Sequence, residues 1–136
     1  MTKGFNDNRR CFVCGERNPE GLKISFRLDK ERGEADSEVS FPDHFQGWEK
    51  VVHGGLLATV LDEAMIYAAG AKGFRCVTGE ITVRYMRPAK TGESYRLKGR
   101  VTGEKKERIV FAESEITGEA GEIVDRATGK LFKVRE

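Results

Sequence analysis

The chain has 136 residues, 38% hydrophobic and 34% charged, a balance typical of one soluble globular domain with a sizeable core. Basic and acidic residues number 24 and 22, so the net charge of +2 gives no support for a nucleic-acid partner. No apolar stretch reaches membrane-spanning length, and the odd count of three cysteines argues against a disulfide framework. We therefore expect a cytoplasmic protein without a membrane partner.

The first 20 residues are polar and irregular, and we predict an amino-terminal arm (residues 1–20) followed by a single domain over residues 21–136. In this arm, Cys11 and Cys14 have the two-residue gap found in zinc knuckles and in redox pairs. A structural zinc would need two more ligands. The candidates are one cysteine and two histidines: Cys76, His44 and His53. Because no second paired motif is present, we favour a packed, reduced cysteine pair and predict no metal.

Apolar residues alternate over residues 22–28 and predict a half-buried strand; residues 35–41 predict a second, more polar strand ended by Pro42. After Gly55 the apolar residues follow a helical period through four turns. They occupy more than half of the helix circumference: Leu56, Leu57, Val60, Leu61, Ala64, Met65, Ala68 and Ala69. A helix of this kind needs cover on most sides, so we expect a sheet to wrap around it.

Four further segments with alternating apolar residues follow the helix and predict successive antiparallel strands. They span residues 81–85, 95–101, 109–116 and 123–134. The order of two strands, one long helix and four strands indicates an α+β class, with a curled antiparallel sheet around one central helix.

The helix start carries two glycines, Gly54 and Gly55, and the carboxylates of Asp62 and Glu63 lie midway along the helix. Bare amides at a helix start favour an anion or a polarised carbonyl, and a carboxylate in an apolar helix is costly unless it is paired, solvated or used chemically. Eight residues, about 12 Å of helix, separate Gly54 from Asp62. One small reacting group cannot contact both within one chain, so we infer that a second copy supplies half of the site.

These motifs resemble those of the hotdog-fold acyl-CoA thioesterases. Residues 53–55 read His-Gly-Gly, Asp62 follows nine positions after that histidine, and residues 85–92 read Tyr-Met-Arg-Pro-Ala-Lys-Thr-Gly. The match is to the phenylacetate-degradation type within the 4-hydroxybenzoyl-CoA thioesterase superfamily. Residues 11–22, with Cys-Phe-Val-Cys-Gly, Asn-Pro and Gly-Leu, also resemble the amino-terminal signature of one branch of that group.

The resemblance implies a homodimer, often paired again into a homotetramer, with two equivalent sites at the dimer interface. It implies that the amide of Gly54 polarises the thioester carbonyl and that Asp62 of the other subunit acts as nucleophile or general base. A hydroxyl at the position of Thr78 would hold the attacking water. We expect Gly55 to add a second substrate contact, and no cofactor is required for this chemistry.

The remaining candidates have weaker motifs. We expect His53 to cap the helix, hold the glycine turn or orient the substrate through hydrogen bonds. Several relatives carry a polar amide at the position of Gly47, and Gln46 beside it is the candidate replacement.

The two acids of the helix, Asp62 and Glu63, have two possible roles: catalysis or substrate contact, or a structural ion pair with an arginine. We favour Asp62 as the catalyst and keep Glu63 as a substrate contact. Three cations near Pro88 would meet coenzyme A phosphates or form a solvated strand face: Arg84, Arg87 and Lys90.

The sequence therefore predicts an enzyme that hydrolyses acyl-CoA thioesters to a carboxylic acid and coenzyme A. A non-catalytic acyl-CoA binding or sensing module on the same fold is the alternative, and Asp62 argues against it. A dehydratase or hydratase of related fold would need a catalytic histidine at the reacting carbon, whereas both histidines precede the helix core. The acyl group stays open between aromatic and medium aliphatic chains.

Overall fold

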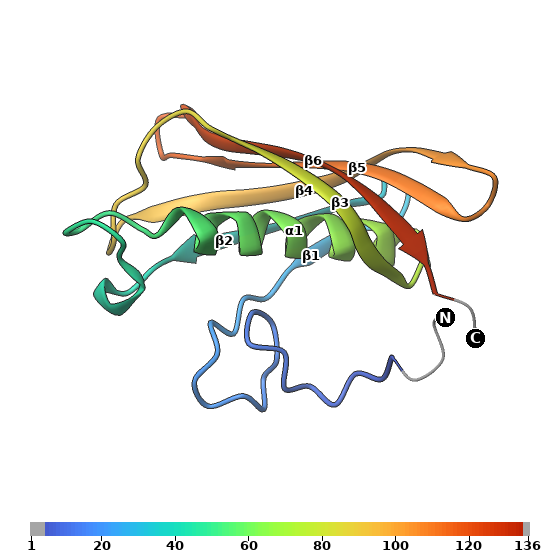
Figure 1. Cartoon of the computed structure of the whole chain (residues 1–136), viewed down its shortest axis with the longest axis horizontal. Helices are drawn as coiled ribbons and strands as arrows, with labels where there is room; N and C mark the ends of the chain where they lie inside the picture. The colour runs from blue at the N-terminus through green and yellow to red at the C-terminus, as the bar shows by residue number, and fades with distance from the viewer. Residues whose placement is uncertain (1–4, 135–136) are drawn as a thin grey trace.

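A six-stranded antiparallel sheet curls over one long helix in the computed structural model, which describes residues 5–134 (Figure 1). The elements in chain order are β1 (Arg27–Asp29), β2 (Glu34–Ser40), the 3-10 helix η1 (Asp43–Phe45), α1 (Gly54–Ala71), β3 (Cys76–Tyr85), β4 (Ser94–Lys105), β5 (Ile109–Thr117) and β6 (Ile123–Lys133). The strand order is β1-β2-β4-β5-β6-β3, with every neighbouring pair antiparallel. The predicted α+β architecture is confirmed.

The helix α1 buries one broad face against the sheet and leaves a narrower stripe partly open. Its buried residues are Leu57, Val60, Leu61, Ala64, Met65, Ala68, Ala69 and Ala71. Thr59, Asp62 and Ile66 lie on the other side of the helix and are only partly buried. One chain therefore leaves this stripe of its own helix partly uncovered, and the stripe contains an acid.

The position of α1 against the sheet is fixed by close packing and by one buried hydrogen bond. Gly99 of β4 faces Ala64, and a Cβ atom on Gly99 would lie only 2.3 Å from the Ala64 carbonyl oxygen. The Ser114 hydroxyl on β5 donates a 2.8 Å hydrogen bond to the Leu61 carbonyl. These contacts leave little freedom for α1 to rotate, so the sheet determines which way Asp62 points.

The first predicted strand is shorter than the alternation of residues 22–28 indicates, because pairing with β2 begins only at Arg27. Residues 22–26 hydrogen-bond instead to the preceding turn, with the N–H of Leu22 donating to the Phe12 carbonyl at 2.8 Å and that of Ile24 to the Val13 carbonyl at 2.9 Å. Leu22, Ile24 and Phe26 still pack against the core. The alternation therefore indicated burial correctly at Leu22, Ile24 and Phe26, whereas Leu28, inside the short strand β1, is 45% exposed.

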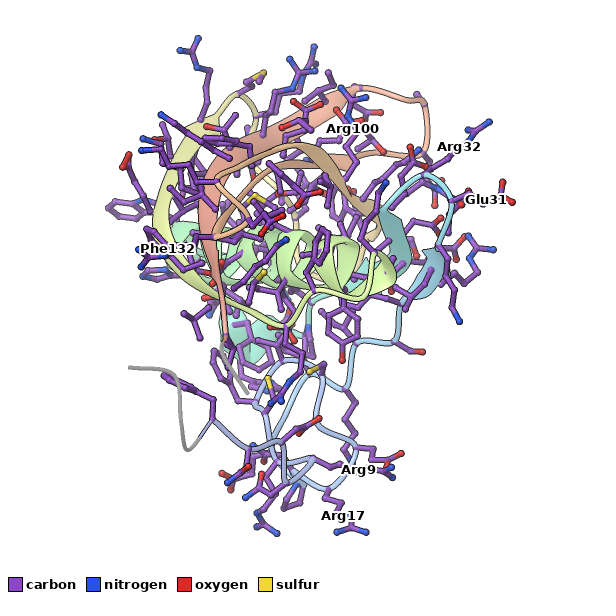
Figure 2. The ribbon with its side chains drawn as sticks, turned by 90° about the vertical axis from the view of Figure 1, so that its right-hand side faces the viewer. Arg9, Arg17, Glu31, Arg32, Arg100 and Phe132 are labelled. Carbon is purple, nitrogen blue, oxygen red and sulfur yellow. The ribbon has the colours of Figure 1, made fainter. Side chains whose placement is uncertain are left out.

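The amino-terminal segment lies on the opposite side of α1 from the sheet (Figure 1). In the turned view of Figure 2, Arg9 and Arg17 mark its outer end, whereas Arg100 lies on the opposite side of the molecule. Residues 5–20 contain turns but no helix or strand. The outer ends of the predicted arm and domain, residues 1–4 and 135–136, lie outside the described residues. Within residues 5–134, no helix is both long enough and apolar enough to span a membrane.

Candidate active site

Asp62 and Thr78 form a hydrogen-bonded pair on the open stripe of α1. The Thr78 Oγ1 donates to the Asp62 Oδ1 at 2.5 Å, which links the helix to the edge strand β3. Both side chains are partly exposed. Since Thr78 uses its single hydroxyl proton on Oδ1, the second carboxylate oxygen, Oδ2, remains available as a base or nucleophile. The pair has the composition expected for activating a water molecule.

A β-bulge places Thr78 on this side of the sheet. The pairing of β3 with β6 runs from Thr78 opposite Leu131 directly to Glu80 opposite Lys130, so Gly79 is an extra residue. Beyond the bulge the side chain of Val83 packs against the core. Glu80 is three residues before Val83 on the same strand, so its side chain points to the outer face of the sheet. Without the extra residue, strict alternation would put Thr78 on the outer face together with Glu80. The bulge therefore builds the contact with Asp62.

The start of α1 offers one amide rather than two. His53 caps the helix, and its Nδ1 atom accepts a 2.9 Å hydrogen bond from the Gly55 N–H. Among the described residues, none accepts a hydrogen bond from the Gly54 N–H. The Tyr85 hydroxyl donates to the Gly54 carbonyl at 2.7 Å, which ties the end of β3 to the helix start. The bond to His53 occupies the Gly55 amide that we expected to contact the substrate, whereas the role of the free Gly54 amide stays a prediction.

The helix start and the acid cannot act on one small group within a single chain. α1 runs without interruption from Gly54 to Ala71. The rise of a regular helix puts about 12 Å between Gly54 and Asp62. The structure thus retains the separation that led us to infer a second copy of the chain.

Glu63 lies beside the two cysteines of the amino-terminal segment and not beside Thr78. The Cys11 thiol donates to the Glu63 Oε2 at 3.7 Å, and the ligand atoms of Cys11, Cys14 and Glu63 all lie within 4.8 Å of one another. Burial raises the pKa of Glu63 and, together with its hydrogen bond to Glu63, the pKa of the Cys14 thiol. Sequence reasoning missed this cluster because at least 49 residues separate the acid from the thiols.

The other predicted substrate contacts lie in the loop before α1, on β3 and in the connection after β3. The Gln46 Oε1 accepts a 2.9 Å hydrogen bond from the Lys50 N–H, so this carboxamide holds its own loop. Arg84 lines a groove on the outer sheet face, away from the core contacts of its neighbour Val83. Arg87 and Lys90 are exposed in the connection after β3. Among the described residues, none of the three cations forms an ion pair with Asp62, whose hydrogen-bond partner is Thr78, so their role toward coenzyme A phosphates stays a prediction.

A buried acid that the sequence analysis did not single out lies near the helix start. Asp125 on β6 is 0% exposed, and its two carboxylate oxygens accept no hydrogen bond from the described residues. It pairs across the sheet with Tyr85, the residue bonded to Gly54. Burial raises the pKa of Asp125 to about 6, although the nearby Met86 amide opposes the shift. The sequence does indicate this burial, because Asp125 lies two residues before Ala127 on the same strand and alternation points both side chains toward the core.

Comparison with known proteins assigns the chain to a family. A sequence model of the thioesterase superfamily matches residues 49–120, and the chain belongs to that superfamily. One solved thioesterase superfamily protein is 25% identical to this chain, with a TM-score of 0.84. The superposition covers 92% of this chain and 60% of that protein, so this chain spans less than two thirds of its length. No curated protein matches the chain significantly.

Two further solved structures with a similar fold belong to proteins described in terms of phenylacetic acid degradation. The PaaI protein of the E. coli phenylacetic acid degradation operon has 23% identity and a TM-score of 0.76, covering 84% of this chain and 81% of its own. A putative thioesterase of Ralstonia eutropha, described as phenylacetic acid degradation-related, has 25% identity and a TM-score of 0.72, covering 82% and 85%. The resemblance and the hotdog fold predicted from the sequence are confirmed.

Proposed function

We propose that the protein hydrolyses acyl-CoA thioesters to a carboxylic acid and coenzyme A. Membership of the thioesterase superfamily supports thioester hydrolysis. A hotdog protein of Streptococcus mutans with 19% identity and a TM-score of 0.74, solved bound to acetyl CoA, supports coenzyme A as the thiol part of the substrate. The observation that carries the proposal is the hydrogen bond between Thr78 and Asp62 on the uncovered stripe of the helix.

In the proposed mechanism Asp62 activates water and Thr78 fixes the carboxylate. Oδ2 of Asp62 takes a proton as the water oxygen attacks the thioester carbonyl carbon. The carbonyl oxygen becomes an oxyanion that accepts a hydrogen bond from the Gly54 amide of a second copy. The C–S bond then breaks. The leaving sulfur takes the proton that Asp62 held, so coenzyme A is released as the thiol and Asp62 is again a carboxylate. Attack by Asp62 itself, followed by hydrolysis of the anhydride, uses the same groups.

The edge of the sheet supports a shared site. β3 is a terminal strand of the sheet, and an uncovered edge favours pairing with another strand. The end of this strand also exposes apolar surface, since Tyr85 is 51% and Met86 43% exposed. We propose a homodimer joined along β3, which would bring the helix start of one copy toward Asp62 of the other. Arg87 and Lys90, which follow the same strand, remain the candidates for coenzyme A phosphates, and assembly into a tetramer stays a prediction.

Complementation between two inactive variants tests the shared site. Asp62→Asn removes the base and keeps the shape of the side chain. Gly54→Pro removes the amide proton at the first helical position, where proline is tolerated, and the preceding His53 already has the extended φ of −59° and ψ of 131° that proline requires. Gly54→Ala is the matched control because it keeps the N–H, and its Cβ would lie at an ordinary 3.5 Å from the Tyr85 ring.

Asp62→Asn and Gly54→Pro should each lose at least about 100-fold in kcat for release of the coenzyme A thiol, the scale of losing a general base or an oxyanion donor. Gly54→Ala should retain more activity than Gly54→Pro. After subunit exchange, the mixture of Asp62→Asn and Gly54→Pro should regain part of the wild-type rate, since some sites then hold both intact groups. No recovery in spite of demonstrated exchange would refute the shared site. Full activity in Asp62→Asn would refute the function of that residue.

A further inference from the structure

The two cysteines of the amino-terminal segment lie in a tight turn that brings both thiols to one side. The Gly15 N–H donates to the Cys11 carbonyl at 2.8 Å, and the Val13 N–H donates to the Cys11 Sγ at 3.4 Å. A Cβ on Gly15 would lie 2.4 Å from the Cys11 nitrogen, so the turn requires glycine at that position. A backbone N–H pointing at the sulfur stabilises thiolate character. This local geometry suits a metal-binding cysteine pair.

The helix supplies a third ligand to the same point. Glu63 of α1 extends toward the turn, and its carboxylate and the two sulfur atoms lie within 4.8 Å of one another. All three side chains are partly buried. Two thiolates and one carboxylate carry three negative charges when deprotonated, and a thiophilic divalent cation offsets two of them. Because the ligands come from two distant parts of the chain, an ion there would cross-link the amino-terminal segment to α1.

We propose that Cys11, Cys14 and Glu63 bind a thiophilic divalent cation of the Zn²⁺ type, which anchors the amino-terminal segment to the helix. Three protein ligands and one water complete a tetrahedral site. The site is separate from the proposed thioester chemistry, since Asp62 bonds to Thr78 and belongs to the neighbouring stripe. Its expected role is structural, and the proposal differs from the packed, reduced cysteine pair that the sequence alone favours. A redox pair would account for the two thiols but not for the converging carboxylate.

Metal titration of the full chain under reducing conditions tests this site. The protein, stripped of metal by a chelator, is titrated with Co²⁺ and then with Zn²⁺. One ion should bind per chain, thiolate-to-cobalt charge-transfer absorption should appear, and Zn²⁺ should displace it. Cys14→Ser and Glu63→Gln should each weaken Zn²⁺ binding at least about 100-fold, the upper end of what loss of a merely supporting group causes. Cys76→Ser is the matched control, because Cys76 is the third free thiol and lies outside the cluster.

Amide hydrogen exchange is a second measurement, which separates loss of the metal site from a general loss of folding in the variants. Zn²⁺ should slow amide hydrogen exchange of residues 11–26 in the wild type and in Cys76→Ser, but not in Cys14→Ser. Absence of one-to-one binding in the folded wild type would overturn the proposal. Unchanged affinity in Glu63→Gln would overturn the three-ligand site, and equal losses in Cys76→Ser and Cys14→Ser would show that the metal binds elsewhere.

Discussion

The Thr78 hydroxyl donates a 2.5 Å hydrogen bond to the Asp62 carboxylate and so connects the edge strand to the central helix. The contact depends on the bulge at Gly79, which reverses the parity of β3 between Thr78 and Glu80. A single bond thereby holds Asp62 in one orientation at an open face. An acid held in this way needs no further rearrangement before it accepts a proton, which is the property a general base requires.

Thr78→Val should reduce kcat while leaving the fold intact. Valine has the shape of threonine but lacks the hydroxyl, so Asp62 loses its fixed orientation. We expect kcat for thiol release to fall by roughly 10- to 100-fold, within the range of a general-base contribution. Thr78→Ser is the control, since it keeps the hydroxyl and should retain most of the rate. Equal losses in the valine and serine variants would show that packing, and not the hydrogen bond, is responsible.

His53→Ala should destabilise the start of α1. The Gly55 N–H would lose the Nδ1 acceptor that it bonds at 2.9 Å, and loss of a helix N-cap costs about 1 kcal/mol. Urea denaturation should show this loss as a lower midpoint with an unchanged slope. His53→Asn should remain near the wild type, because asparagine is itself a good N-cap residue. A destabilisation of the asparagine variant as large as that of alanine would indicate that the imidazole acts through packing.

Asp125→Asn should change how stability depends on pH. Burial raises the pKa of Asp125 from 3.8 to about 6, so the folded chain holds this proton more tightly than the unfolded chain does. Its contribution is therefore favourable below about pH 4 and is lost as the pH rises through 6. The loss by pH 7 amounts to about 3 kcal/mol at 1.4 kcal/mol per unit of pKa. Asparagine at this position has no proton to lose and removes this dependence.

Urea denaturation at pH 4 and pH 7 measures the effect as the difference between the two proteins. The stability of Asp125→Asn relative to the wild type should increase between pH 4 and pH 7. The exposed Glu119→Gln serves as the control for a change of charge and should follow the wild type. A parallel pH profile for Asp125→Asn and wild type would show that Asp125 is not the group that titrates.

The fold was predictable because its strongest signals are local. The apolar residues between Leu56 and Ala69 repeat with the helical period, and all of them lie in the helix Gly54–Ala71. Alternation likewise located β2, β4, β5 and β6. It was misleading at residues 22–28, where Leu22 and Ile24 are half-buried by contacts with a turn and not by a sheet partner. Alternation of apolar residues indicates which side chains are buried. Strand pairing depends in addition on whether the backbone of another strand lies next to the segment.

The site was predictable only in part because two of its features are non-local. Family resemblance indicated Thr78, but alternation alone puts it on the outer face with Glu80, and only the bulge brings it to Asp62. The approach of Glu63 to Cys14 depends on how residues 5–26 fold back over α1, which no periodicity encodes. Asp125 is a different case, because it lies two residues before the buried Ala127 on β6 and alternation alone predicts that its side chain faces the core.

Gly99→Ala should destabilise the protein strongly, because it forces α1 away from β4. The added Cβ would lie 2.3 Å from the Ala64 carbonyl oxygen and 2.5 Å from its carbonyl carbon, and both are backbone atoms that cannot rotate away. Overpacking of this kind costs about 1–3 kcal/mol. Gly70→Ala is the contrasting substitution, since a Cβ there meets nothing within 4 Å, and it should stabilise the helix by roughly 0.5–1 kcal/mol. Urea denaturation compares the two, and a tolerated Gly99→Ala would show that the helix is not held as tightly against the sheet as these contacts require.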